Sequence, residues 1–187
     1  MEKKKNRLWN GIFSKEPDKL MEKFNASINF DQKLYQEDIT GSIAYAKALA
    51  KAKVITEEEA KKIERGLLYV KKIIEDGIIR LSWQDEDIHM AIEKRLRHYI
   101  GEIADKLHTG RSRNEQVVLD ERLYLKKEIK EIIKLIIGLQ KALLRQAEKH
   151  LDVIMPGYTH LQHAQFIRFS HYLMALFFML ERDKQRL

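Results

Sequence analysis

The sequence predicts an all-α protein, and three observations lead to that fold class. Only two prolines and eight glycines occur in 187 residues, so few positions interrupt a helix. Apolar residues recur at three- and four-residue spacing along nearly the whole chain, which is the period of one helix face. Serine or threonine followed three residues later by an acid precedes several of these segments, a pattern typical of helix starts.

The first two expected helices follow a segment of different character. Residues 1–30 predict irregular structure because turn formers cluster at Trp9-Asn10-Gly11 and Asn25-Ala26-Ser27. The apolar period then predicts a helix from about Gln32 to Lys53. Thr56 and Glu59 form a capping box, which predicts a second helix that Gly77 stops.

A third helix is expected between Ser82 and Gly101. Ser82 with Asp85 makes a start like the previous one, and the apolar residues turned inward are Ile88, Ile92 and Leu96. Acidic residues such as those of Asp85-Glu86-Asp87 are favourable at the positive N-terminal end of a helix. This structural role accounts for most of them without a catalytic or binding function. His89 has no such explanation and is therefore a candidate site residue.

The longest helix is expected after Asn114. The chain runs without glycine or proline until Gly138 and continues to about Leu151, beyond the length of an ordinary globular helix. Its stripe predicts a bundle element and comprises Leu125, Ile129, Ile132, Ile133, Ile136, Leu143 and Ala147. Pro156-Gly157 predicts a break, and a last helix is expected from about Gln165 to the end. Because that helix is apolar around much of its circumference, it needs neighbours from other subunits or from a larger bundle.

Residues 107–116 concentrate more polar chemistry than any other stretch. A helix start already attracts anions, because its first N–H groups lack partners and the peptide dipoles add. Three side chains add to this effect and predict a place for a carboxylate or phosphate: Arg111, Arg113 and Asn114. Ser112 and Glu115 also fit a capping box, so for these two residues alone a purely structural role is the simpler interpretation.

A second polar cluster follows Pro156-Gly157 and comprises Thr159, His160, Gln162 and His163. Thr159 could cap the last helix, and His160 could be an ordinary hydrogen-bonded core residue. The alternative is a catalytic site at the mouth of that helix. No HExxH or other compact ligand spacing occurs among the seven histidines, so no metal site is expected.

Composition excludes several classes of protein. The chain has no cysteine, and therefore no disulfide framework or thiolate chemistry. We expect a cytoplasmic protein without a membrane partner, because no long uncharged apolar stretch and no secretory signal occur. The net charge of +7 would suit a nucleic-acid binder, but most basic residues alternate with acids, as in residues 57–62. We therefore expect no nucleic-acid partner.

Taken together, five segments in order resemble argininosuccinate lyase of the fumarase and aspartase superfamily. They are Leu8-Trp9-Asn10-Gly11-Ile12-Phe13-Ser14, Phe24-Asn25-Ala26-Ser27-Ile28, Glu86-Asp87-Ile88-His89, Lys106-Leu107-His108-Thr109-Gly110-Arg111-Ser112-Arg113-Asn114 and Pro156-Gly157-Tyr158-Thr159-His160-Leu161-Gln162. The resemblance implies a fumarase/aspartase-like fold, with a small, mainly helical N-terminal domain over 1–112. Residues 113–187 would be the first, truncated part of a central helical bundle.

The resemblance also implies a reaction, the reversible elimination that splits argininosuccinate into arginine and fumarate in arginine biosynthesis, without a cofactor or metal. Removing a proton beside a carboxylate spreads negative charge onto oxygen, so cationic and hydrogen-bonding donors must meet it. The leaving guanidine must be protonated by an acid with a pKa near neutral. By similarity, Ser27, Asn114 and Thr159 would bind substrate. Thr159 and His160 would be the catalytic residues, His160 by transferring protons or orienting its partners. The remaining residues that would line or support the site are His89, Arg111, Ser112, Arg113 and Gln162.

The resemblance further implies a homotetramer whose active sites each take segments from three subunits. This chain departs from the family at Glu115, where the family usually has aspartate, and at His163-Ala164-Gln165-Phe166, where it has Arg-Ala-Gln-Pro. The family's chains are longer, and their serine loop, Gly-Ser-Ser-x-Met-Pro-x-Lys, has no counterpart in these 187 residues. We therefore expect an N-terminal portion of a lyase that is inactive alone. The alternatives are a non-catalytic, crystallin-like structural protein and a lyase for another succinyl adduct.

Overall fold

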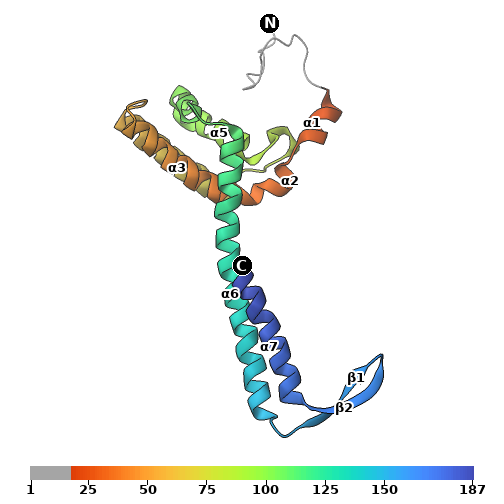
Figure 1. The fold of residues 1–187 in the computed structure, drawn as a ribbon. Coiled ribbons are helices and arrows are strands. Elements are labelled where there is room, and N and C mark those ends of the chain that lie inside the picture. The colour runs from red at the N-terminus through yellow and green to blue at the C-terminus, as the bar shows by residue number, and fades with distance from the viewer. Residues whose placement is uncertain (1–17) are drawn as a thin grey trace. The chain divides into compact units, whose positions relative to one another are not determined.

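The computed structural model describes residues 18–187 and is mostly helical, which confirms the all-α class apart from one pair of strands. The chain forms two compact units, divided between Glu121 and Arg122. Figure 1 shows the helices of both units and the single hairpin. The segment Leu8–Ser14 and the turn expected at residues 9–11 lie outside the described residues. No helix among residues 18–187 is both long and apolar enough to cross a membrane.

The first described residues are helical, contrary to the expectation of irregular structure over 1–30. Helix α1 spans Lys19–Asn25 and α2 spans Ile28–Asp31. Asp18 caps α1, because its side chain accepts a hydrogen bond from the Leu20 amide at 2.8 Å, a cap that was not predicted. The turn expected at Asn25-Ala26-Ser27 corresponds to Ala26 and Ser27, the two residues between these helices.

Three longer helices build the first unit together with short 3-10 segments. The 3-10 segment η1 (Gln32–Leu34) leads into α3 (Tyr35–Lys51), and α4 (Glu57–Glu75) follows; both α-helices lie where the sequence predicts them. Both hydrogen bonds of the Thr56–Glu59 capping box are present, at 3.1 and 2.9 Å. Helix α5 spans Ile88–Ile100, and the 3-10 segment η3 spans Gly101–His108.

The start of α5 differs from the expectation. Ser82 and Asp85 do form a capping box, but it opens only the 3-10 segment η2 (Trp83–Asp85). Asp87 caps α5 instead, accepting a hydrogen bond from the Met90 amide at 2.6 Å. Glu86 separates the two starts with a φ of 65°, a left-handed conformation that no helix can continue through.

The core of the first unit lies where α3, α4 and α5 pack together. The residues expected to face inward from α5, namely Ile88, Ile92 and Leu96, are fully buried. They meet Ile39 of α3 and Leu67 of α4. Gly66 allows the close approach of α4 and α5, because a Cβ there would lie 2.6 Å from Leu96 Cδ1. The helix periodicity thus correctly identified the buried face.

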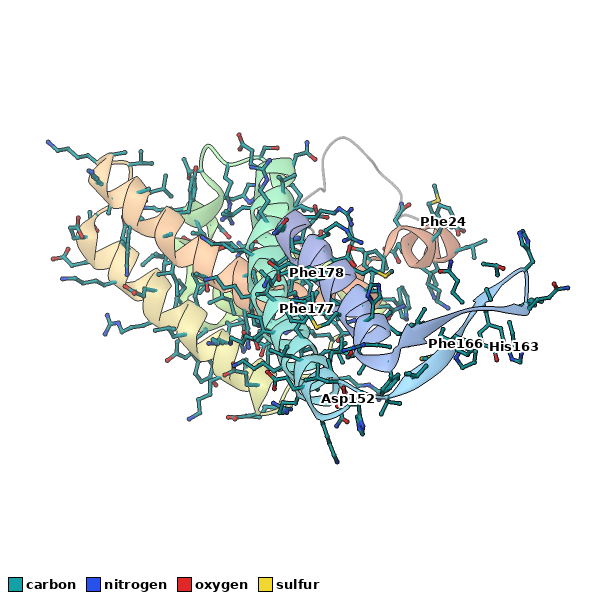
Figure 2. The ribbon with its side chains drawn as sticks, turned by 60° about the horizontal axis from the view of Figure 1, so that its bottom comes forward. Phe24, Asp152, His163, Phe166, Phe177 and Phe178 are labelled. Atoms are coloured by element: carbon teal, nitrogen blue, oxygen red, sulfur yellow. The ribbon has the colours of Figure 1, made fainter. Side chains whose placement is uncertain are left out.

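Helix α6 spans Arg113–Lys149 and confirms the long helix expected from the sequence. Within the second unit, α7 (Phe169–Arg186) runs back along the C-terminal part of α6 (Figure 1). A polar contact joins these helices, since Gln140 Nε2 donates to the Phe177 carbonyl at 3.3 Å and to Glu181 Oε2 at 3.0 Å. Figure 2 shows Phe177 and Phe178 on α7.

The segment between α6 and α7 is an antiparallel hairpin, so the last helix, expected from about Gln165 to the end, is present but begins later, at Phe169. Strand β1 spans Ile154–Thr159, and β2 spans Gln162–Arg168. Pro156 and Gly157 lie inside β1 at a register irregularity, where the missing N–H of proline is tolerated. A Cβ at position 157 would lie 3.0 Å from the Gln165 carbonyl oxygen, so glycine permits the close approach of the two strands.

Candidate functional site

One face of α3 receives the segment that begins α6. Asp38, Gly41, Ser42 and Tyr45 follow one another at the i, i+3, i+4, i+7 spacing that places side chains on the same side of a helix. The first three are buried. This face is therefore a polar surface inside the first unit, and the Gly-Arg-Ser-Arg-Asn turn docks onto it.

Ser112 and Glu115 cap α6, as the simpler interpretation of these residues held. The Asn114 amide donates to Ser112 Oγ at 3.2 Å, and Glu115 Oε2 accepts from the Ser112 amide at 3.0 Å. Glutamate thus performs the capping that the family's usual aspartate would perform. The Asn114 side chain takes no part in the cap and is exposed.

Arg111 attaches the turn to α3. Its Nη1 and Nη2 donate to Ser42 Oγ at 3.2 and 3.3 Å, and its guanidinium carbon lies 5.1 Å from the centre of the Tyr45 ring. The Tyr45 hydroxyl donates in turn to the Thr109 carbonyl at 2.8 Å. A hydroxyl, an aromatic face and a backbone carbonyl together hold the turn around Gly110, whose φ is 71°.

Arg113 is held by groups from α5 and α6. Its Nη1 donates to Gln116 Oε1 at 2.7 Å and lies 3.4 Å from Glu93 Oε1, and Asp87 is 3.8 Å from its Nε. Nδ1 of His108 lies 3.1 Å from Glu93 as well. The two guanidinium groups predicted to hold an anion are therefore engaged by the fold itself. Among the described residues, Arg111 Nε and Arg113 Nη2 are buried without a hydrogen-bond partner.

Ser27 lies beside the start of α5. Its backbone N–H and that of Ile28 donate to the Glu86 carbonyl at 2.9 and 3.0 Å, and its hydroxyl donates to Asp31 Oδ2. The other oxygen of Asp31 accepts from the Ile88 amide at 3.2 Å. Burial raises the pKa of Asp31, and the hydrogen bond from Ser27 opposes that shift. The fold thus fixes Ser27 next to the segment that carries His89.

His89 belongs to a buried polar cluster that the sequence analysis found only in part. Its Nδ1 lies 2.9 Å from Asp38 Oδ1 and 3.4 Å from Asp120 Oδ2, and the three residues are 2%, 1% and 1% exposed. Gln116 Nε2 also donates to Asp38 Oδ1. Asp38 and Asp120 were missed because each lies within an apolar-periodic helix and carries no motif of its own. The pattern that could have identified Asp38 and Asp120 is an acidic residue on the apolar, buried face of a helix.

The two carboxyl groups of this cluster titrate in opposite directions. Burial raises the pKa of Asp120 to about 8, and the neighbouring charge of Asp38 adds to that shift. Burial also disfavours the charged form of Asp38, but the hydrogen bonds from His89 and Gln116 and the positive charge of Arg111 together outweigh burial and lower its pKa. Three ligand atoms of Asp38, His89 and Asp120 lie within 4.8 Å of one another, a spacing that could hold a metal ion. Spacing along the chain could not reveal such a cluster.

Thr159, His160 and Gln162 gather on the hairpin of the second unit, where all three are exposed. Thr159 pairs with Gln162, which leaves a two-residue turn of His160 and Leu161 with φ values of 50° and 61°. Thr159 therefore lies in a strand and caps no helix, and His160 is not a core residue. The structure thus groups Ser27, His89, Arg111 and Arg113 in the first unit, and the hairpin residues in the second.

His163, one of the departures from the family pattern, faces across the hairpin. Its Nε2 lies 2.8 Å from the Tyr158 hydroxyl, and the two rings meet edge to face with centres 4.9 Å apart. Phe166, the other departure, pairs with Pro156 across the strands and is 88% exposed. Figure 2 shows both side chains on the hairpin.

Comparison with known proteins extends these observations. The sequence pattern of a family described as lyase matches residues 11–187. This chain belongs to that lyase family. It is 52% identical over 180 residues to argininosuccinate lyase of Bacillus velezensis, a match that covers 96% of this chain and 39% of the relative. Against argininosuccinate lyase of Acetivibrio thermocellus the identity is 50% over 181 residues, covering 97% of this chain and 40% of the relative. The resemblance seen in the sequence is confirmed.

The fold is also similar to solved lyases. A variant of EDDS lyase with bound fumarate matches with a TM-score of 0.74 and 28% identity, covering 91% of this chain and 34% of that protein. This chain therefore spans about two fifths of the length of the curated relatives and about a third of that solved structure.

Proposed function

We propose that the protein carrying this chain is an argininosuccinate lyase, which eliminates arginine from argininosuccinate and leaves fumarate. One observation carries the proposal. The chain is 52% identical, over 96% of its length, to a curated enzyme of that name. The similarity to EDDS lyase with bound fumarate supports the same product. We expect no cofactor, because acid, base and anion-binding groups suffice for an elimination of this kind.

We assign substrate binding to Ser27, Asn114 and Thr159, and proton transfer to His160. Ser27 is held firmly by Asp31 and the Glu86 carbonyl, as a positioned donor should be. Asn114 has an exposed amide at the positive end of a 37-residue helix, a place suited to a substrate carboxylate. His160 is exposed and occupies a left-handed turn, a backbone conformation often retained at functional sites.

The other site residues line or support the pocket in this proposal. Ser112 caps α6 by accepting from the backbone N–H of Asn114 and so fixes the backbone of that residue. Arg111 and Arg113 fix the turn and contribute the positive charge of their guanidinium groups, in which Arg111 Nε and Arg113 Nη2 are buried without a hydrogen-bond partner among the described residues. Gln162 pairs with Thr159 and steadies the hairpin. His89 joins this set through the buried cluster.

We propose further that the whole protein is a homotetramer in the cytoplasm. Several large apolar side chains of the second unit are exposed in the single chain, among them Leu125, Leu135, Leu139, Phe178 and Met179. Such surfaces are typical of helices that pack against further helices of an assembly. This would also let residues from different subunits share one site.

Appearance of fumarate from argininosuccinate, followed by ultraviolet absorbance with the intact purified protein, tests the activity. We expect turnover without any added cofactor. Fumarate from another N-succinyl amine but none from argininosuccinate would overturn the substrate and favour the second candidate, which the similarity to EDDS lyase supports. Fumarate from neither would support a structural protein of the same fold.

A further inference from the structure

The carboxyl group of Asp120 is the least explained polar group of the first unit. The residue is 1% exposed, and among the described residues neither oxygen accepts a hydrogen bond from a nitrogen donor. An ionised carboxylate in such a place is costly, because it has lost its water without gaining donors. One oxygen of Asp38, Oδ2, is buried and lacks a partner in the same way.

We propose that Asp38 and Asp120 hold a single proton between them, and that this pair positions His89 and the turn of Arg111 for catalysis. With the proton on Asp120, its hydroxyl donates to Asp38 Oδ2. That one hydrogen bond gives Asp38 Oδ2 a donor and removes the charge of Asp120, and two carboxyl groups in contact avoid ionising together. The positioning role rests on the proposed lyase activity, whereas the shared proton does not.

Close packing of two helices brings the pair together. Gly41 of α3 faces Leu119 and Asp120 of α6, and a Cβ at position 41 would lie 3.0 Å from Leu119 Cδ2 and 3.5 Å from Asp120 Oδ1. Alanine at this position would already require the Leu119 side chain to shift, and a longer side chain would crowd the Asp120 carboxyl group. Glycine at this point of α3 therefore permits the contact.

The surrounding charges favour one proton in the pair. Asp120 is faced by Asp38 and Glu37 from α3, by His89 from α5, and by Arg111 from the turn before α6. Arg111 balances the charge of Asp38, and a second ionised aspartate would require His89 to become a cation. Burial, which raises the pKa of Asp120 to about 8, agrees with a neutral Asp120 at physiological pH.

The shared proton also sets the tautomer of His89. Nδ1 faces acceptor oxygens of Asp38 and Asp120 at 2.9 and 3.4 Å, so it carries the hydrogen. Nε2 of a neutral imidazole is then a hydrogen-bond acceptor. If Asp120 lost its proton, a protonated His89 would turn Nε2 into a donor. The pair thus controls what His89 offers to its surroundings.

A metal ion is the competing occupant of this cluster, since three ligand atoms lie within 4.8 Å. Two contacts argue against it. Nδ1 of His89 could bind a metal only through its lone pair, without a hydrogen. It faces a carboxylate oxygen of Asp38 instead, as a protonated, hydrogen-bond-donating nitrogen does. That same oxygen of Asp38 also accepts from Gln116. A proton satisfies the cluster without disturbing either contact.

Two substitutions of Asp120 in the intact protein separate a shared proton from an ionised carboxylate. Asp120→Asn keeps a donor toward Asp38, as a protonated acid does, whereas Asp120→Ala removes it. At pH 6 we expect Asp120→Asn to retain turnover within about threefold and Asp120→Ala to lose up to about 100-fold through misplacement of the site. Asp152→Asn, at an exposed aspartate, is the matched control.

Two further readouts test the proton itself. Infrared difference spectra of the wild type should show the C=O stretch of a protonated carboxylic acid that disappears above about pH 8 and is absent in Asp120→Asn. Because the folded state holds a proton that the unfolded chain loses near pH 4, the wild-type midpoint of thermal unfolding should fall as pH rises from about 4 to about 8. Asp120→Asn should remove most of that slope.

Three results would overturn the proposal: equal losses in Asp120→Asn and Asp120→Ala at pH 6, no acid band, or one equivalent of Zn²⁺ or Mn²⁺ bound by calorimetry and lost in Asp120→Asn. If the wild type shows the acid band but releases no fumarate, the shared proton stands and the lyase assignment fails.

Discussion

At the scale of the residue, the buried carboxyl groups of the first unit meet donors from the protein itself. Arg95 illustrates this, since its Nη1 and Nη2 donate to the two oxygens of Asp85 at 3.0 and 3.2 Å. Burial alone would raise the pKa of Asp85, but the Arg95 contacts lower it. Arg111 and Arg113 are engaged in the same manner. Basic residues in a motif therefore act here first on the protein itself, and any substrate meets groups that are already oriented.

His160 is the residue whose replacement should affect turnover most directly. We expect His160→Ala in the intact protein to lower kcat by roughly 10²–10⁴-fold if the histidine moves protons. Initial rates of fumarate release measure the effect, and unchanged circular dichroism excludes unfolding. His163→Ala is the matched control from the same hairpin. A loss far below tenfold for His160→Ala would leave this histidine a structural role only.

At the scale of the element, the hairpin turn has a strained backbone at an exposed residue. Leu161 is 98% exposed and has a φ of 61°, a conformation that only glycine adopts without cost. Two-residue hairpins usually place Asn-Gly or a similar pair in this turn, where this chain has His-Leu. The preceding residue is His160, so the strained turn is also the part of the hairpin that carries the expected proton-transfer group.

Leu161→Gly should relieve that strain. We expect the substitution to stabilise the hairpin by about 1 kcal/mol, because left-handed backbone costs a side chain about that much. Amide hydrogen exchange of β1 and β2 measures local stability without depending on the rest of the chain. Leu161→Ala, which keeps the strained φ, should show no such gain. Equal protection in both variants would contradict a strained turn.

Two helical glycines should respond in opposite ways to alanine. Gly66 faces Leu96 and Ile100, whose atoms would lie 2.6 and 2.9 Å from a new Cβ, so Gly66→Ala should destabilise the first unit by about 1–3 kcal/mol through overpacking. Gly138 has nothing within 4 Å among the described residues, so Gly138→Ala should stabilise α6 by roughly 0.5–1 kcal/mol through helix propensity. Urea unfolding measures both. Stabilisation by Gly66→Ala would show that α4 and α5 can separate at no cost.

At the scale of the whole molecule, the exposed apolar side chains of α6 and α7 fit the homotetramer proposed above. Leu135 is 74% exposed in the middle of a 37-residue helix. Leu135→Lys should therefore disrupt a tetramer of the intact protein, because a charged side chain would have to be buried between helices. Light scattering with size exclusion measures the mass. Lys130→Glu, an exposed charge on a different side of the same helix, is the control. A wild type that is already monomeric would rule out the assembly.

How much the sequence could predict differs between local and distant interactions. Helices α3, α4, α5 and α6 follow from apolar periodicity and capping residues, because those signals act within one or two turns of the chain. The Ser112–Glu115 cap is an example in which both hydrogen-bond partners lie three residues apart. The hairpin could not be predicted from such local signals, because Pro156-Gly157 resembles a break between helices. Only the pairing of β1 with β2 shows that these two residues lie in a strand.

Residues that are close along the chain encode the helical class, the capped helix starts and the lyase motif around Gly110. The direction in which the charges of that motif point, and the acids that meet behind it, depend on the packing of distant helices. His89 and Gln116 both contact Asp38, which lies 51 positions from His89 and 78 positions from Gln116 along the chain. Burial and close approach, which raise the pKa of Asp120 and turn Arg111 toward α3, arise only when distant helices pack, and no local pattern records them.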